Sequence, residues 1–273
     1  MVNTLGNVIG FGQKSGIYLY NDIRFDYYIV IRRTAMPDIY ILKTDRNMEK
    51  GDFDRLLDCV SEEKKKRILR FHRYEDAQRT LLGDVLARYA ICKRSGAGDE
   101  KLGNLYKNLV FTANEYGKPL LLEPNGICFN ISHSGSWVVC AVDDAAVGID
   151  VEIIKPIDFK VAERFFSGDE YISLMKQPEE LRLAYFYKLW TLKESYIKMI
   201  GKGLSIPLNS FTMNIQNRGI NVSVGNETKG FHFDQSFLDS GTVYAVCAQN
   251  KDIHEDIYLN IESFLELLRG RIL

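Results

Sequence analysis

The stretch that decides the organisation of this chain reads WTLKESYIK, runs from Trp190 to Lys198, and is closed by Gly-Lys-Gly at 201–203. Good helix formers without internal glycine or proline lead into it from near Pro178, which predicts one helix ending at this stretch. Five apolar residues recur at helical spacing and predict a stripe buried in the core: Tyr185, Leu189, Leu192, Tyr196 and Met199.

Two charged residues of this helix lie on a shared face, directed away from the apolar stripe. Glu194 and Lys198 are four residues apart. A solvated ion pair, worth about 0.3–0.5 kcal/mol, would be enough to explain them. Trp190, one turn before Glu194, places a large aromatic residue near the carboxylate, which favours a more specific role.

A second stretch, GIDVE at 148–152, adds two more carboxylates. The runs 137–142 and 147–152 alternate with period two and are rich in β-branched residues, so they predict a β-hairpin joined at 143–146. Alternation places Asp150 and Glu152 on one face of the second strand. Two acids at that spacing repel each other, so either both are solvated on an edge strand or a cation lies between them.

Composition limits the classes of function. A chain of 273 residues forms one large domain or two small ones, and its 35 Lys and Arg against 36 Asp and Glu indicate no polyanionic partner such as nucleic acid. The five cysteines form no C-x-x-C pair, and their odd number argues against a disulfide framework. Neither a membrane span of about 18–20 apolar residues nor a signal-peptide pattern is evident. We therefore expect a soluble, cytoplasmic protein without a membrane partner.

Residues 1–35 differ from the rest and offer no chemistry, so they are predicted to be an N-terminal extension, with an ordinary extra strand as the alternative. A cleaner strand follows at 38–42.

From Ser61, a predicted helix N-cap, to Arg79 the sequence carries seven basic and four acidic residues, a net charge of +3. Arg79 lies in the first turns of a helix predicted from Tyr74 to Lys93. This run is either a solvated face or a local anion site.

The three acids Asp150, Glu152 and Glu194 suit a hard divalent cation, since Mg²⁺ prefers a few carboxylates together with water and phosphate oxygens. Basic residues elsewhere would hold the rest of a phosphorylated ligand: Lys64, Arg67, Arg79, Lys118 and His133. The residues alone therefore predict a magnesium-dependent enzyme that acts on a pyrophosphate substrate.

Five motifs resemble, in order and spacing, those of the 4'-phosphopantetheinyl transferases, most closely the Sfp type that activates peptide synthetases. They are YGKP at 116–119, FNISHS at 129–134, GIDVE at 148–152, RFFSGDE at 164–170, and the stretch 190–204. The likeness also covers 79–86 and extends from about Asp38 to near Leu268.

This resemblance implies an α+β fold of two similar halves related by a pseudo-twofold, each a small sheet packed with helices. The halves would be 36–144 and 145–273 of a monomer, with coenzyme A in the cleft between them. It implies Mg²⁺ on Asp150, Glu152 and Glu194, beside the coenzyme A pyrophosphate. The residues implied to bind coenzyme A are Lys64, Arg67, Arg79, Tyr116, Gly117, Lys118, Ser132, His133 and Lys198.

The implied reaction is the attack of a carrier-protein serine on the β-phosphorus of coenzyme A, with departure of 3',5'-ADP. Glu194, or a water that it orients, is the candidate base, Lys198 would stabilise the leaving phosphate, and Asp150 and Glu152 would complete the catalytic group. The acceptor would be an apo peptidyl, acyl or polyketide carrier domain, as in nonribosomal peptide, polyketide or antibiotic biosynthesis. It would dock after Gly201, on apolar residues of that segment: Ile206, Leu208, Phe211 and Met213.

Two other functions compete with this one. A non-catalytic module that binds coenzyme A or a nucleotide would keep the fold without the reaction. A metal-dependent pyrophosphate hydrolase would consume coenzyme A without an acceptor protein.

Overall fold

The computed structural model describes residues 37–96, 103, 106–216, 219–249 and 255–270. The chain divides into two compact units, 1–32 and 33–273, and the description below concerns the second. The extension expected at 1–35 lies outside the described residues. None of the helices in the described ranges is long and apolar enough to cross a membrane. All five cysteines lie within these ranges and are unpaired.

The first part of the second unit confirms the predicted strand after Met36, the helix capped by Ser61 and the helix from Tyr74. Ser61 Oγ accepts the N–H of Lys64 at 3.3 Å and so begins the second helix. The elements are β1 (Asp38–Lys43), α1 (Lys50–Leu57), α2 (Glu62–Ile68), α3 (Tyr74–Arg94), β2 (Val110–Ala113), β3 (Pro119–Glu123), β4 (Cys128–Ser134) and β5 (Trp137–Asp143).

The second part contains the long helix predicted around Trp190. Its elements are β6 (Val147–Ile153), α5 (Lys160–Phe165), α6 (Gly168–Met175), α7 (Glu179–Ile200), the 3₁₀ turns η1 (Gly203–Ser205) and η2 (Leu208–Ser210), β7 (Thr212–Gln216), β8 (Gly219–Val224), β9 (Glu227–Lys229), β10 (His232–Asp239), β11 (Thr242–Ala248), β12 (Glu255–Asn260) and α8 (Ile261–Leu268).

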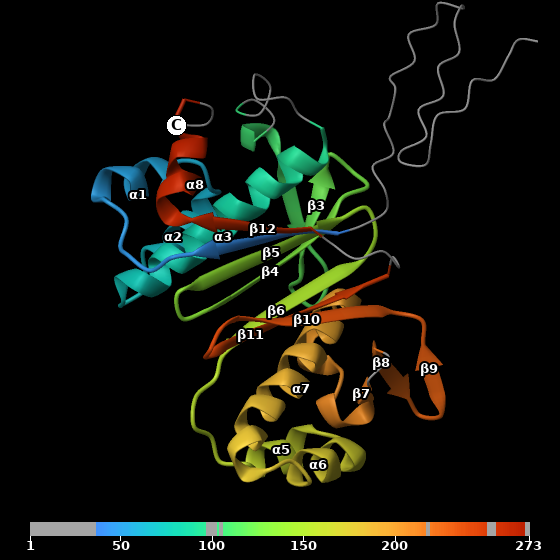
Figure 1. The fold of residues 1–273 in the computed structure, drawn as a ribbon. Helices are drawn as coiled ribbons and strands as arrows, with labels where there is room; N and C mark the ends of the chain where they lie inside the picture. Colours follow the sequence, from blue (N-terminus) through green and yellow to red (C-terminus); the bar gives the residue numbers. More distant parts are fainter. Residues whose placement is uncertain (1–36, 97–102, 104–105, 217–218, 250–254, 271–273) are drawn as a thin grey trace, which may run out of the picture. The chain divides into compact units, whose positions relative to one another are not determined.

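Two sheets form the centre of this unit. One has the order β12-β1-β5-β4 and the other β10-β11-β6, while β2-β3 and β7-β8-β9 form smaller sheets. In Figure 1, α1, α2, α3 and α8 lie on one side of the first sheet, and α5, α6 and α7 lie on the far side of the second. Each central sheet therefore packs against one long helix, and the α+β class with two such halves is confirmed.

Alternation along the strands explains this layering. On β5, Val138 and Cys140 face the core shared with α3, while Val139 and Ala141 face the other sheet. On β11, Tyr244 and Val246 face the inter-sheet core, while Val243 and Ala245 face the core shared with α7. Hydrophobic side chains of both sheets make up this inter-sheet core, and their burial stabilises the face-to-face packing.

The hairpin predicted from 137 to 152 is wrong. The strand β5 pairs with β1 on one edge and β4 on the other, whereas β6 pairs with β11 in the second sheet. Because both edges of β5 are already hydrogen-bonded, no edge is left for β6. Every residue of β5 is buried, which is the pattern of a central strand rather than half of an exposed hairpin. The connection at 144–146 instead carries the chain from one sheet to the other.

The end of the chain returns to the first half. Strand β12 pairs in parallel with β1, and α8 places Phe264 and Leu268 in the same core as α3. The expected range 145–273 therefore includes a segment, 255–268, that packs with the other half. The pairing of β12 with β1 spans more than 200 residues of sequence, which sequence pattern does not record.

Candidate active site

The helix α7 begins after Pro178 and ends at Gly201, whose φ of 80° gives the left-handed C-cap that glycine adopts without strain. The predicted stripe is confirmed: Tyr185 is partly buried and the other four residues are buried. Trp190 stacks on Phe186 with ring centroids 5.7 Å apart, so it belongs to the core of the second half. The helix is thus held firmly beneath the second sheet.

Gly148 allows this helix to approach β6 closely. A Cβ atom at this position would lie 2.1 Å from the carbonyl oxygen of Ser195 and 2.4 Å from the amide nitrogen of Met199. Backbone atoms cannot yield by that much, so only glycine fits. The close contact brings Glu194 and Lys198 against the strand that carries Asp150 and Glu152.

Lys198 and Asp150 form the centre of the site. The Lys198 ammonium donates to Asp150 Oδ1 at 2.6 Å, to Ser132 Oγ at 3.0 Å and to the carbonyl of Ile149 at 3.3 Å, which occupies its three donors. Since Ser132 Oγ accepts from an ammonium, its own proton is directed to Asp150 Oδ1 at 2.9 Å. Asp150 is only 3% exposed, so the alternative of solvated edge-strand acids is wrong for this residue.

The other two acids share the electrostatic environment of Asp150. Burial and the charge of Asp150 raise the pKa of Glu152, with hydrogen bonding by Ser134 acting in the opposite direction. Burial, followed by the charge of Asp150, raises the pKa of Glu194 to about 7 against the lowering effect of Lys198. The lysine therefore offsets only part of the repulsion among the three carboxylates.

These residues fit a divalent cation. Asp150 Oδ2 is buried without a hydrogen-bond partner, although Oδ1 of the same carboxylate has two. A buried carboxylate oxygen without a partner is costly unless a cation completes the site. Within the described residues no three His, Cys, Asp or Glu side chains converge closely enough to enclose a metal as they stand. Mg²⁺ does not require such a cage, because it retains water and takes oxygens from substrate phosphates.

The predicted basic ligands divide into two groups. Lys64 pairs with Asp84 at 2.8 Å, and Arg67 is exposed on the same helix, α2. Arg79 donates to the carbonyl of Gly135 at 2.8 Å, pairs with Asp76, and lines a cavity of about 410 Å³.

His133 and Ser132 are adjacent on β4, and alternation directs them to opposite faces of the strand. Partial loss of hydration, followed by the charge of Arg79, lowers the pKa of His133. The structure thus brings His133 close to Arg79, and Ser132 to the acidic centre.

The YGKP turn at 116–119 caps the end of α7. The Lys118 ammonium donates to the carbonyls of Met199 at 3.1 Å and Val147 at 3.3 Å, and burial lowers its pKa. Asn114 Nδ2 donates to the carbonyl of Gly201 at 2.6 Å. Of the other predicted ligands in this turn, Tyr116 is exposed, and Gly117 adopts a φ of +83°. Asn114 was not among the residues predicted from the sequence, and its position before a turn is the only local signal.

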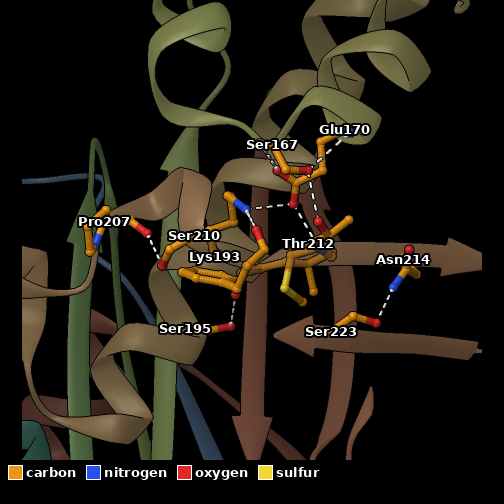
Figure 2. Close-up of polar contacts among 12 residues, drawn as sticks. Ser167, Glu170, Lys193, Ser195, Pro207, Ser210, Thr212, Asn214 and Ser223 are labelled. Atoms are coloured by element: carbon orange, nitrogen blue, oxygen red, sulfur yellow. Dashed lines mark hydrogen bonds and ion pairs between the residues drawn. The ribbon is translucent and has the colours of Figure 1, made fainter. Parts of the chain in front are cut away.

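A buried ion pair next to Glu194 was also missed (Figure 2). Lys193 Nζ lies 2.6 Å from Glu170 Oε1 and 2.8 Å from the carbonyl of Phe211, and burial lowers its pKa to about 8. Glu170 also accepts the N–H of Met213 at 2.6 Å and completes a capping box with Ser167 at the start of α6. The network joins α6, α7 and β7, and its only signal in the sequence was a lysine four residues after Leu189 and three before Tyr196, at the spacing of the apolar stripe.

One prediction about the segment after Gly201 needs correction. Three of the residues expected to present an apolar surface, Leu208, Phe211 and Met213, are each 2–3% exposed and belong to the second core. After Ile206 the chain turns toward the core and buries these side chains. The apolar composition of the segment does not distinguish a buried side chain from one on an exposed docking surface. Leu204 is 73% exposed and lies with Ile206 beside a hollow of about 190 Å³ that is also lined by Arg164 and Phe165.

Two halves built on central sheets, with acids on β6 and a Glu–Lys pair on α7, define a class that two family models describe. The model for the 4'-phosphopantetheinyl transferase superfamily matches residues 146–248, and the model for the N-terminal part of 4'-phosphopantetheinyl transferases matches residues 47–145. The junction between the two matches falls at the passage from β5 to β6.

Individual relatives agree. The chain is 39% identical to 4'-phosphopantetheinyl transferase Sfp of Bacillus subtilis over 84% of this chain and 99% of that protein. It is 46% identical to the transferase psf-1 of Bacillus pumilus over 64% of this chain and 72% of that one. It is 42% identical to the transferase gsp of Aneurinibacillus migulanus over 64% and 70%, respectively. The chain belongs to the 4'-phosphopantetheinyl transferase family.

Proposed function

We propose that this protein transfers the 4'-phosphopantetheine group of coenzyme A to a serine of an apo carrier protein and releases 3',5'-ADP. Family membership supports the reaction class, and the acidic centre supports catalysis over simple binding. The observation that carries most weight is Asp150, which is held on one oxygen by Lys198 and Ser132 and left unpartnered on the other. A module that only bound coenzyme A would have no need of this costly arrangement.

Mg²⁺ is the proposed cofactor, and Asp150, Glu152 and Glu194 are the residues that would hold it. When bound, Mg²⁺ spreads the negative charge that develops on the two phosphates during transfer. The chain's own residues account for the rest of the site. Ser132 and Lys198 keep the Asp150 carboxylate in place, and Lys193 with Glu170 fixes the turn of α7 that presents Glu194.

Glu194 is the proposed acceptor of the proton from the attacking serine, directly or through one water. An ordinary carboxylate with a pKa of about 4.3 is a weak base for a hydroxyl group. In the metal-free protein, burial raises the pKa of Glu194 to about 7, but a bound Mg²⁺ would oppose that shift, so Glu194 is proposed to act mainly by positioning the serine or its water.

Lys198 is proposed to meet the leaving phosphate, although its three donors are occupied in this structure. The bond to the carbonyl of Ile149 is the longest of the three, at 3.3 Å. A phosphate oxygen would replace that neutral acceptor with a charged one, while the bond to Asp150 remains. Arg79 and His133 are proposed to bind the 3'-phosphoadenosine end with Lys64 and Arg67.

The acceptor is proposed to be a peptidyl, acyl or polyketide carrier domain that docks on Leu204 and Ile206. Leu204 is the most exposed large apolar residue of the described chain, and it follows directly from the end of α7. We propose that the protein acts as a monomer, as the resemblance to this family implies.

The test is mass spectrometry of an apo carrier protein after incubation with coenzyme A, Mg²⁺ and the full chain. A mass gain of one phosphopantetheine group, absent with EDTA and absent when the acceptor serine is replaced by alanine, is the expected result. Coenzyme A consumed without a carrier would establish the hydrolase instead. Coenzyme A bound without any turnover would establish the non-catalytic module.

A further inference from the structure

The strand β6 lies at the edge of its sheet, so its outward N–H groups have no ladder partner. Side chains of β4, the edge strand of the other sheet, take that place. Asn130 Oδ1 accepts the N–H of Ile149 at 2.9 Å, and Ser134 Oγ accepts the N–H of Ile153 at 3.1 Å. Two side chains four residues apart thus join the two sheets along the strand that carries Asp150 and Glu152.

Ser134 has a second contact that Asn130 lacks. Its Oγ lies 3.0 Å from Oε2 of Glu152. Because an amide N–H can only donate, Ser134 Oγ must act as acceptor toward Ile153, and its single proton is then directed to the Glu152 carboxylate. Among the described residues this is the one hydrogen bond that Glu152 accepts.

The end of β4 is itself held in place. Gly135, with a φ of +56°, follows Ser134, and a Cβ at Gly135 would lie 1.8 Å from Cδ1 of Ile153. The side chain of Ile153 therefore occupies the space that any other residue at 135 would need. Ile153 thus lies beside the turn that follows Ser134, and its own N–H is the group that Ser134 Oγ accepts.

We propose that Ser134 is a positioning residue that orients the Glu152 carboxylate for the divalent cation. The inference rests on the metal site of the proposed function. Without this bond, Glu152 is repelled by Asp150 and is free to turn toward solvent. Removal of a hydrogen-bond partner of a metal ligand costs about 10- to 100-fold in metal affinity.

The experiment measures the binding of Mn²⁺ alone to the full chain by electron paramagnetic resonance at pH 8, where Glu194 is mainly deprotonated. The variants are Ser134→Ala, Ser134→Thr, Asn130→Ala and Asp150→Asn. We expect Ser134→Ala to weaken Mn²⁺ binding by about tenfold or more and Ser134→Thr, which keeps the hydroxyl, to bind as wild type. Asn130→Ala loses the equivalent hydrogen bond to a backbone N–H of β6 but no contact with a carboxylate. Its melting temperature should therefore be lower than that of the wild type, and its Mn²⁺ affinity should be unchanged.

The outcomes separate the inference from the function on which it rests. Wild-type Mn²⁺ affinity in Ser134→Ala, with weakened binding in Asp150→Asn, overturns the role of Ser134 alone. Equal losses in Ser134→Ala and Asn130→Ala overturn it as well, since both would then act through the junction of the sheets. Wild-type Mn²⁺ affinity in Asp150→Asn would contradict the proposed metal site itself, and with it the proposed function. If Ser134→Ala does not fold, Ser134→Cys fills the same space with a weak donor and is expected to show the same loss.

Discussion

The ammonium nitrogen of Lys198 lies 2.6 Å from Oδ1 of Asp150, a residue 48 positions earlier in the chain, and the side chain of Asp150 is only 5% exposed. This pair joins the central helix to the edge strand of the second sheet. It also places one positive charge among three acids, which a surface ion pair between Glu194 and Lys198 would not do. Both its stability and its catalytic consequences can be measured.

We expect Lys198→Met to lower the free energy of unfolding of the metal-free protein by about 2–3 kcal/mol, somewhat less than a fully buried pair. Mg²⁺ should then raise the melting temperature of Lys198→Met more than that of the wild type, because it offsets the repulsion that the lysine no longer relieves. The kcat should fall by about 10²–10³, with a smaller change in KM for coenzyme A. If the free energy of unfolding fell by only a few tenths of a kcal/mol and the kinetics were normal, Lys198 would instead be part of a solvated surface ion pair.

The pKa of Glu194 predicts a pH dependence of metal binding. With a pKa of about 7 in the folded state against about 4.3 in the unfolded chain, Glu194 is protonated in the folded protein through the range where the unfolded chain is not. Mg²⁺ must displace that proton, so its affinity should rise as the pH increases from 6 to 8. In Glu194→Gln the affinity should be lower and this part of the pH dependence absent, as measured by titration calorimetry.

The same linkage fixes the sign of a stability change. Because the folded state binds the extra proton, Glu194 contributes stability at pH 4 that is lost as the pH rises through 7. Urea unfolding in EDTA between pH 4 and 8 should therefore show a smaller decline in Glu194→Gln than in wild type. An identical decline in both would show that Glu194 is not the group responsible.

How much of this was accessible from the sequence depends on the range of each signal. The helical stripe of α7 and the alternation that sets Asp150 beside Glu152 are local, and both were predicted correctly. The hairpin failed because period-two patterning identifies a strand without naming its partner, and β5 already has two neighbours. The roles of Asn130 and Ser134 were missed for a similar reason, since the polar alternation of β4 gains meaning only when β6 lies opposite.

Lys118 gives a direct choice between the sequence-based role and the structural one. Its ammonium donates to the carbonyls of Val147 and Met199, so we expect Lys118→Met to lower the free energy of unfolding by about 1–3 kcal/mol. The KM for coenzyme A should change by no more than a few-fold. Unchanged stability together with a large rise in KM for coenzyme A would show that Lys118 binds coenzyme A, as the resemblance implied. Urea unfolding and steady-state kinetics on the same preparation decide between them.

The last prediction concerns Lys193 and Glu170, whose side chains are 0% and 1% exposed. Removal of one partner leaves the other charged and buried, so Lys193→Met and Glu170→Gln should each cost about 3–5 kcal/mol. In the double variant neither charge remains, and the glutamine can still accept the N–H of Met213, so the cost should fall short of the sum by about 1–3 kcal/mol.

Urea unfolding of the four proteins in this double-mutant cycle gives the coupling energy, with Lys176→Met, an exposed lysine at the end of α6, as a control that should change by less than about 0.5 kcal/mol. Because Lys193 precedes Glu194 on α7, the single variants should also lower kcat, and the double variant should regain part of it as the helix is held again by apolar packing. Strictly additive free energies would mean that the two charges act separately, and Glu194 would then owe its position to the apolar stripe alone.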